Sequence, residues 1–128
     1  APRSLTLTAA NPTVLNGNIG VPNLLNALTI TNASNIGAAI NTVGAQTYGG
    51  AMTLSANSSL TSNTGDVTIS STVDGGSNAL TINNAGTTSS IAGVISNLSD
   101  LIIAGSGTLT LTSNNTYTGT TTINSGTL

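Results

Sequence analysis

A short alternating phrase recurs along the chain: an aliphatic residue, a threonine, a second aliphatic residue and then a small polar residue. Alternation of apolar and polar residues, rich in threonine, is typical of a β-strand with one buried face. The first three copies begin at Leu5, Leu28 and Met52, and this nearly constant spacing predicts a solenoid in which each coil adds a strand. The copies are Leu5–Thr8, Leu28–Thr31, Met52–Ser55, Val67–Ser70, Leu80–Asn83 and Leu109–Thr112.

Strands near residues 5, 28, 52, 80, 101 and 121, taken as one register, predict an all-β fold of about five to six coils of ~23 residues. The long step from 52 to 80 predicts a loop or bulge around Asp66 to Asn78. A gapless match of Thr47–Leu54 to Thr116–Ile123 agrees with three such periods. It places Tyr48 and Tyr117 at equivalent points. No linker interrupts the pattern, so residues 1–128 are predicted to form one array.

The composition is unusual for a globular protein. The chain has 24 Thr, 17 Asn and 16 Ser, against one Arg, three Asp and no Lys, Glu, His or Cys. Charged residues make up 3%, far below an average of about 25%. The 31 Leu, Ile and Val residues fall at alternating positions, which argues against disorder. Because Phe and Trp are absent, these residues are expected to fill a narrow interior inside a thin coil.

The charge and the apolar runs exclude several classes of function. A net charge of −2 without a basic patch argues against nucleic-acid binding. The apolar runs are too short to span a bilayer as a helix. No His or Lys is present to activate a serine, so the chain is expected to be no enzyme and to carry no cofactor. The carboxylates Asp66, Asp74 and Asp100 are interpreted as turn residues, with a calcium site at Asp66 or Asp74 as the alternative.

The outward residues of the phrase predict a regular polar surface. If the strands stack in one register, these side chains form two parallel files, spaced about 4.8 Å between coils. Such an array suits ice or a glycan as a ligand, whereas the simpler interpretation is that threonine is the natural solvent-facing residue of a strand. The candidate residues are Thr6, Thr8, Thr29, Thr31, Thr53, Ser55, Thr81, Asn83, Thr122 and Asn124.

Three stretches resemble known repeats. The run Leu109–Leu128, which contains Asn115-Thr-Tyr-Thr-Gly119 and ends in Ser125-Gly-Thr-Leu128, is similar to the autotransporter-associated β-strand repeat of bacterial passenger domains. Ser90–Ser96 is similar to the segment that leads into that repeat. Thr42–Leu54 resembles repeats of filamentous-haemagglutinin-type adhesins. Together the resemblance covers most of residues 28–128.

The resemblance implies a right-handed parallel β-helix that is secreted across a Gram-negative outer membrane to the cell surface. It implies a stalk rather than an active head, with no catalytic residues and with host-cell or neighbouring-cell ligands bound through the parent protein. We therefore expect a stiff structural segment, a fragment or subunit of a longer surface structure. The alternatives are a filament subunit that self-associates through the solenoid ends, and a module that binds ice or glycans.

Overall fold

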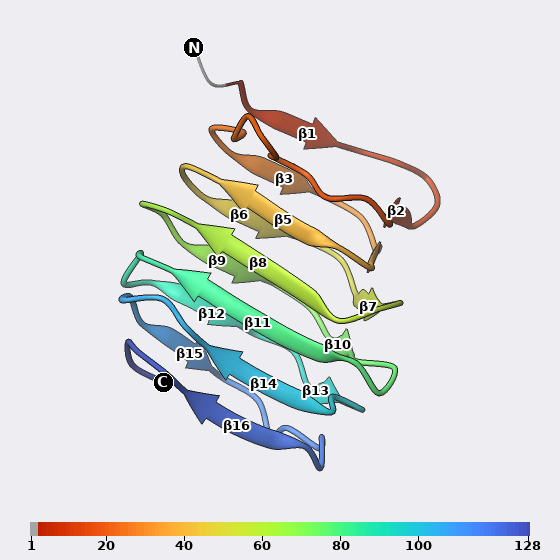
Figure 1. The fold of residues 1–128 in the computed structure, drawn as a ribbon. Helices are drawn as coiled ribbons and strands as arrows, with labels where there is room; N and C mark the ends of the chain where they lie inside the picture. Colours follow the sequence, from red (N-terminus) through yellow and green to blue (C-terminus); the bar gives the residue numbers. More distant parts are fainter. Residues whose placement is uncertain (1–2) are drawn as a thin grey trace.

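The structure, a computed structural model, describes residues 3–128 as a stack of coils, each of which passes through three parallel β-sheets in turn (Figure 1). The described residues contain no helix. The fold is a β-solenoid of about six coils, as the repeated phrase predicts. The right-handed sense of the coil stays a prediction.

The three sheets run the length of the stack, and we name them A, B and C in the order in which the chain enters them. Sheet A contains β1 (Leu5–Leu7), β3 (Leu28–Ile30), β6 (Gln46–Tyr48), β9 (Val67–Ile69), β12 (Ser89–Ile91) and β15 (Leu109–Leu111). Sheet B contains β2 (Thr13–Leu15), β4 (Ser34–Ile36), β7 (Met52–Leu54), β10 (Val73–Asp74) and β13 (Ile95–Ser96). Sheet C contains β5 (Ala39–Thr42), β8 (Ser58–Ser62), β11 (Ala79–Asn84), β14 (Asp100–Ile103) and β16 (Thr120–Ile123).

The coil length varies along the stack, which corrects the expectation of a constant period. On sheet A, Thr6 pairs with Thr29 and Thr29 pairs with Thr47, so the second of these steps is clearly shorter than the first. Copies of the repeated phrase form strands in all three sheets, so they do not all lie on the same face of the coil. Met52 lies in sheet B and Leu80 in sheet C, which accounts for the long step between them. The predicted loop at Asp66 to Asn78 is therefore wrong, because β9 and β10 lie within it.

The expected equivalence of the two tyrosines is also wrong. Three coils after Thr47 the register reaches Thr110, whereas the sequence match pairs Thr47 with Thr116. Tyr48 lies in β6 and points into the core, where it is fully buried. Tyr117 lies in the segment just before β16, and its hydroxyl is 2.7 Å from the hydroxyl of Thr121. The match between the two segments reflects shared composition.

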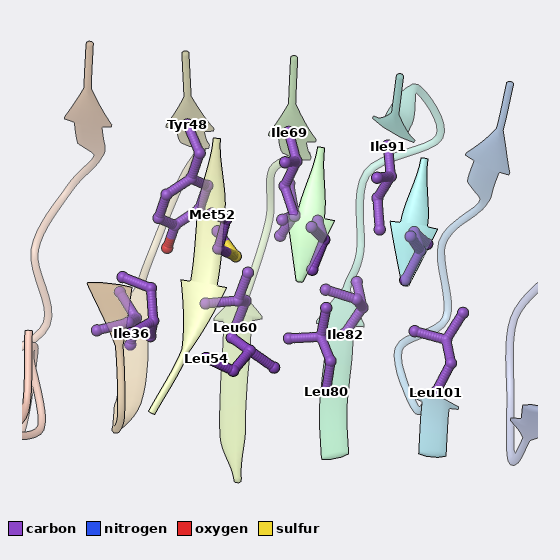
Figure 2. Packing of buried hydrophobic residues seen from close by; sticks show 14 of the residues in the cluster. Ile36, Tyr48, Met52, Leu54, Leu60, Ile69, Leu80, Ile82, Ile91 and Leu101 are labelled. Atoms are coloured by element: carbon purple, nitrogen blue, oxygen red, sulfur yellow. The ribbon is translucent and has the colours of Figure 1, made fainter. Parts of the chain in front are cut away.

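The interior is a column of aliphatic side chains, and the predicted inward orientation of the aliphatic pairs is confirmed. Figure 2 shows side chains from all three sheets pointing into the narrow space between them. Ile69, Leu80 and Ile82 are completely buried, like most of the central positions. Each coil packs on the coils before and after it, so the two outermost coils are less buried. Ile123, in the last coil, is 50% exposed.

Polar side chains occupy one corner of the interior, between sheets C and A. Thr42, Ser62 and Asn84 stack there in successive coils, and each donates to a carbonyl oxygen in the turns of this corner. Beside them, the amide nitrogen of Gln46 donates to the carbonyl oxygen of Thr61 at 2.7 Å. Its amide oxygen accepts from the Tyr48 hydroxyl, also at 2.7 Å. These bonds compensate the cost of burying polar groups in a narrow core.

The corner between sheets A and B is tight, and it has the same length in the central coils. Three residues connect β3 to β4, β6 to β7, β9 to β10 and β12 to β13. At Gly93 in this corner, an added Cβ atom would lie 2.3 Å from the backbone carbon of Ser71 in the coil before it. Glycine is thus required here because two backbones approach each other closely.

Candidate functional site on the outer surface

The structure divides the ten candidate residues among three faces of the coil. Ligand binding by these residues stays a prediction, but they do not form one continuous array. Sheet A and the turn after it carry Thr6, Thr8, Thr29 and Thr31, while sheet B and its following turn carry Thr53 and Ser55. Sheet C and its following turn carry Thr81, Asn83, Thr122 and Asn124. On sheet C, Ile102 lies between Thr81 and Thr122 in the register, so the file is interrupted by an apolar side chain.

An uninterrupted file of hydroxyl groups does exist, on the outer face of sheet A. The repeated phrase predicts only its first two members, because copies of the phrase that a constant period joins in one register lie in different sheets. The strands at Gln46 and Ser89 also begin with a polar inward residue and do not match the phrase. The file consists of the central residues of the six strands: Thr6, Thr29, Thr47, Thr68, Ser90 and Thr110. The available signal was the alternation itself, which places each of these residues between two inward positions.

Asp66 joins two successive coils at the corner between sheets C and A. One carboxyl oxygen accepts from the Thr88 amide at 2.9 Å and from the Ser89 hydroxyl at 3.2 Å, and the other accepts from the Thr88 hydroxyl at 2.6 Å. The Thr88 hydroxyl has the largest effect and lowers the pKa of the Asp66 carboxyl; partial burial opposes it, and the other two bonds lower this pKa further. The ionised Asp66 carboxylate therefore joins two successive coils through hydrogen bonds.

The other two carboxylates have similar bridging roles. Asp74 accepts from the Asn97 amide group at 3.0 Å and from the Gly76 backbone amide at 3.1 Å, and these bonds lower its pKa. Asp100 accepts from the Thr120 hydroxyl in the following coil. Within residues 3–128, no cluster of three or more acidic, His or Cys side chains could hold a metal ion. Of the three residues interpreted as turn residues, Asp66 lies in the turn before β9, whereas Asp74 is the last residue of β10 and Asp100 is the first residue of β14.

A cleft lies at the corner between sheets B and C. Five residues separate Asp74 from Leu80, whereas four separate the equivalent Ser96 and Leu101 in the next coil. The extra residue makes the turn at Gly76 and Ser77 bulge, and both have positive φ values, 53° and 68°. Next to this turn is a cleft of about 410 Å³, lined by Ser77, Asn97, Leu98, Ser99, Thr118 and Gly119.

No described helix is long and apolar enough to cross a membrane. The geometry defines a β-solenoid with polar outer faces. The comparison with protein families adds to this: residues 101–128 match the family described as passenger-associated-transport-repeat. The matched segment contains Leu109–Leu128, so this match and the β-solenoid fold are consistent with the resemblance of that run to repeats of autotransporter passengers. Searches of curated proteins and of solved structures gave no match.

Proposed function

We propose that this chain is a non-enzymatic structural segment of the passenger of a secreted bacterial adhesin, and that it acts as a stiff stalk outside the cell. The observation that carries the proposal is the match to a passenger repeat at residues 101–128. That segment is not a separate appendage, because β14, β15 and β16 continue the three-sheet stack formed by the rest of the chain.

The stiffness of the stalk would come from its backbone. Along each sheet, the strands of successive coils are joined by parallel ladders, and the corners add further bonds between coils, such as that from the Gly75 amide to the Ser96 carbonyl at 2.8 Å. Stacked in this way, the coils give a rod that rises about 4.8 Å per coil. Bending this rod would require many ladder hydrogen bonds to stretch together, so the segment is suited to hold a binding region at a fixed distance.

The folded segment also offers few sites to extracellular proteases. The chain has one residue that trypsin recognises, Arg3, since it contains a single Lys or Arg. Tyr48, one of the two aromatic residues, is fully buried. Proteases act on opened segments, and a continuous stack of short strands and turns offers few of them. Resistance to proteolysis is therefore an expected property of the folded segment.

The test is export and display. The chain is placed between an epitope tag and the β-barrel translocator of an autotransporter, behind a signal peptide, and expressed in a Gram-negative host. We expect the epitope to be detected on intact cells and the segment to survive proteinase K. A Gly93→Val variant, which forces a side chain into the backbone of the preceding coil, is expected to lose protease resistance. Retention of the wild-type segment in the periplasm, or its rapid digestion at the surface, would contradict the proposal.

A second candidate function, a subunit that stacks end to end, is favoured by the geometry of the last coil. β16 lies at the edge of sheet C and pairs with β14 on one side, and all four of its residues are exposed. Ile123 is 50% exposed and Leu128 is 44% exposed. At the opposite end, Leu5 and Leu7 of β1 are partly exposed on sheet A. A strand edge with adjacent apolar side chains can pair with a strand of another molecule.

Sedimentation velocity and negative-stain electron microscopy of the purified chain over a concentration series separate the two functions. Uniform fibres whose length increases with concentration would support stacking. A monomer at all concentrations would reject it and leave the stalk proposal in place. Replacing Ile123 by Lys provides a control, because a charge on the open edge is expected to stop specific stacking without affecting the central coils.

A further inference from the structure

We infer that the cleft at the corner between sheets B and C binds a neutral sugar unit of a glycan. The inference goes beyond the stalk function and does not depend on it. The cleft exists because one extra residue makes the turn at Ser77 project beside the following coil. Its volume of about 410 Å³ lies in the range of small-molecule sites, roughly 300–1,000 Å³. It is large enough for one or two sugar rings.

The polar groups in the cleft are those that recognise hydroxyl groups. The hydroxyls of Ser77, Ser99 and Thr118 have no hydrogen bond to another described side chain or backbone group, and all three residues are exposed. A hydroxyl both donates and accepts, so three of them can match neighbouring hydroxyls on a sugar. Asn97 donates its amide nitrogen to Asp74, which orients its amide and leaves the amide oxygen free to accept. Leu98 also lines the cleft, but it is 3% exposed and belongs to the buried core, so the groups available to a ligand are mainly polar.

The backbone holds these groups in place. Ser77 donates its amide to the carbonyl oxygen of Asn97 at 2.7 Å, and Ser99 donates to the carbonyl oxygen of Asn78 at 3.0 Å. Ser77 and Asn97 both have positive φ values, 68° and 53°, although neither is glycine. For serine this conformation is unfavourable. Glycine would fit the turn at Ser77 better, so a serine there retains a hydroxyl at a cost in stability, which is typical of a functional position.

The charges select a neutral ligand. The only basic residue of the chain, Arg3, lies in the first coil, far along the stack from this corner. The nearby carboxylate of Asp74 would repel an anion such as a uronic or sialic acid. No aromatic residue lines the cleft, so stacking on a sugar ring contributes nothing. We therefore expect weak binding, with a Kd of roughly 1–10 mM for a single sugar unit.

The test is NMR titration of the uniformly ¹⁵N-labelled chain. The probes are the methyl glycosides of galactose, glucose, mannose and fucose, with glucuronate as the charged control. At least one neutral glycoside is expected to shift the amide signals of Ser77, Asn97, Ser99 and Thr118 saturably, and glucuronate is expected to leave them unmoved. The inference is overturned if no neutral glycoside moves these signals at concentrations up to about 100 mM, or if the shifts fall on other coils.

A variant and a matched control separate binding from folding. The cleft variant combines Ser77→Gly, Ser99→Ala and Thr118→Val, and removes all three hydroxyls. The control combines Ser106→Gly, Ser70→Ala and Thr87→Val, which are the same changes at exposed positions outside the cleft and outside the hydroxyl file of sheet A. We expect about three- to tenfold weaker binding for each hydroxyl lost from the cleft, and unchanged binding in the control. Equal affinity in the two variants would overturn the inference.

The single substitution Ser77→Gly keeps the test decisive if the triple variant does not fold. Because glycine adopts a positive φ without strain, this variant is expected to melt at the same temperature as the wild type or higher, while it binds the sugar more weakly. If Ser77 mattered only for folding, the Ser77→Gly variant would have an unchanged or higher melting temperature and would bind the sugar as tightly as the wild type. Failure of this test leaves the export assay for the stalk unaffected.

Discussion

The most quantitative prediction concerns two isoleucines in one interior file of sheet C. Ile82 pairs with Ile103, and Ile103 pairs with Ile123 in the last coil. Ile82 is completely buried, whereas Ile123 is 50% exposed. The substitutions Ile82→Ala and Ile123→Ala therefore delete the same atoms from equivalent places in the coil, and differ in how much of the side chain is buried.

The expected costs follow from burial. An isoleucine-to-alanine change removes about three carbon groups, worth about 0.8 kcal/mol each when fully buried. At Ile82 the surrounding coils cannot close the space, so a cavity term raises the loss of unfolding free energy to about 3–4 kcal/mol. At Ile123 half of the side chain already contacts water and no closed cavity forms. The expected loss there is about 1 kcal/mol.

Equilibrium unfolding in urea, followed by far-ultraviolet circular dichroism, measures the two losses. The dependence of the free energy on denaturant should be the same in both variants and the wild type, which shows that the same surface is exposed on unfolding. Losses of free energy that agree within about 0.5 kcal/mol in the two variants would contradict this prediction, because burial of the side chain would then not determine the cost of removing it.

Three further predictions test the corners and the buried polar groups. Gly93→Ala is expected to cost about 2 kcal/mol or more in chemical denaturation, because its Cβ atom has no room, while Gly17→Ala, with no atom within 4 Å of the added Cβ, should be neutral or slightly stabilising. The Thr88 hydroxyl lowers the pKa of the Asp66 carboxyl. The stability that the Asp66 hydrogen bonds add is therefore complete above the unfolded-state pKa of about 3.9, and it is lost as the pH falls through the lower folded-state pKa. Melting temperatures of the Asp66→Asn variant, measured over this pH range, should lack that part of the acid dependence. Tyr48→Phe, which leaves a buried amide oxygen without its donor, should cost about 1–3 kcal/mol in the same denaturation assay.

Much of the fold could be predicted because strand alternation is a local property. Each coil repeats the same requirement for an aliphatic residue inside and a small polar residue outside, so the solenoid, the inward positions and the narrow core followed from the sequence. The register could not be predicted in the same way. The phrase occurs in all three sheets, and the corner between sheets B and C has two residues before Ala39 but four before Ala79. A count along the chain therefore joins strands from different faces.

The candidate surface was harder to predict for the same reason. Four of the six members of the hydroxyl file lie in strands that the phrase did not assign to the sheet of Thr6 and Thr29. In β6, Gln46 occupies an inward position because its side-chain amide forms hydrogen bonds with the Thr61 carbonyl oxygen and the Tyr48 hydroxyl. The bond to Thr61 joins two coils, so a local sequence pattern does not contain it. The cleft depends on a single additional residue next to Ser77, and its effect appears only when the turn is placed beside the following coil.

The register of the coils defines the three-sheet stack, and disulfide cross-linking can test this register because the chain has no cysteine. Thr47 and Thr68 are paired neighbours on sheet A, and strands about 4.8 Å apart permit a disulfide between them. Thr29 and Thr53, which a constant period would stack, lie in different sheets. After mild oxidation of dilute protein, mass spectrometry should find the disulfide in the Thr47→Cys, Thr68→Cys variant, and free thiols in the Thr29→Cys, Thr53→Cys variant. The reverse result would contradict the three-sheet solenoid.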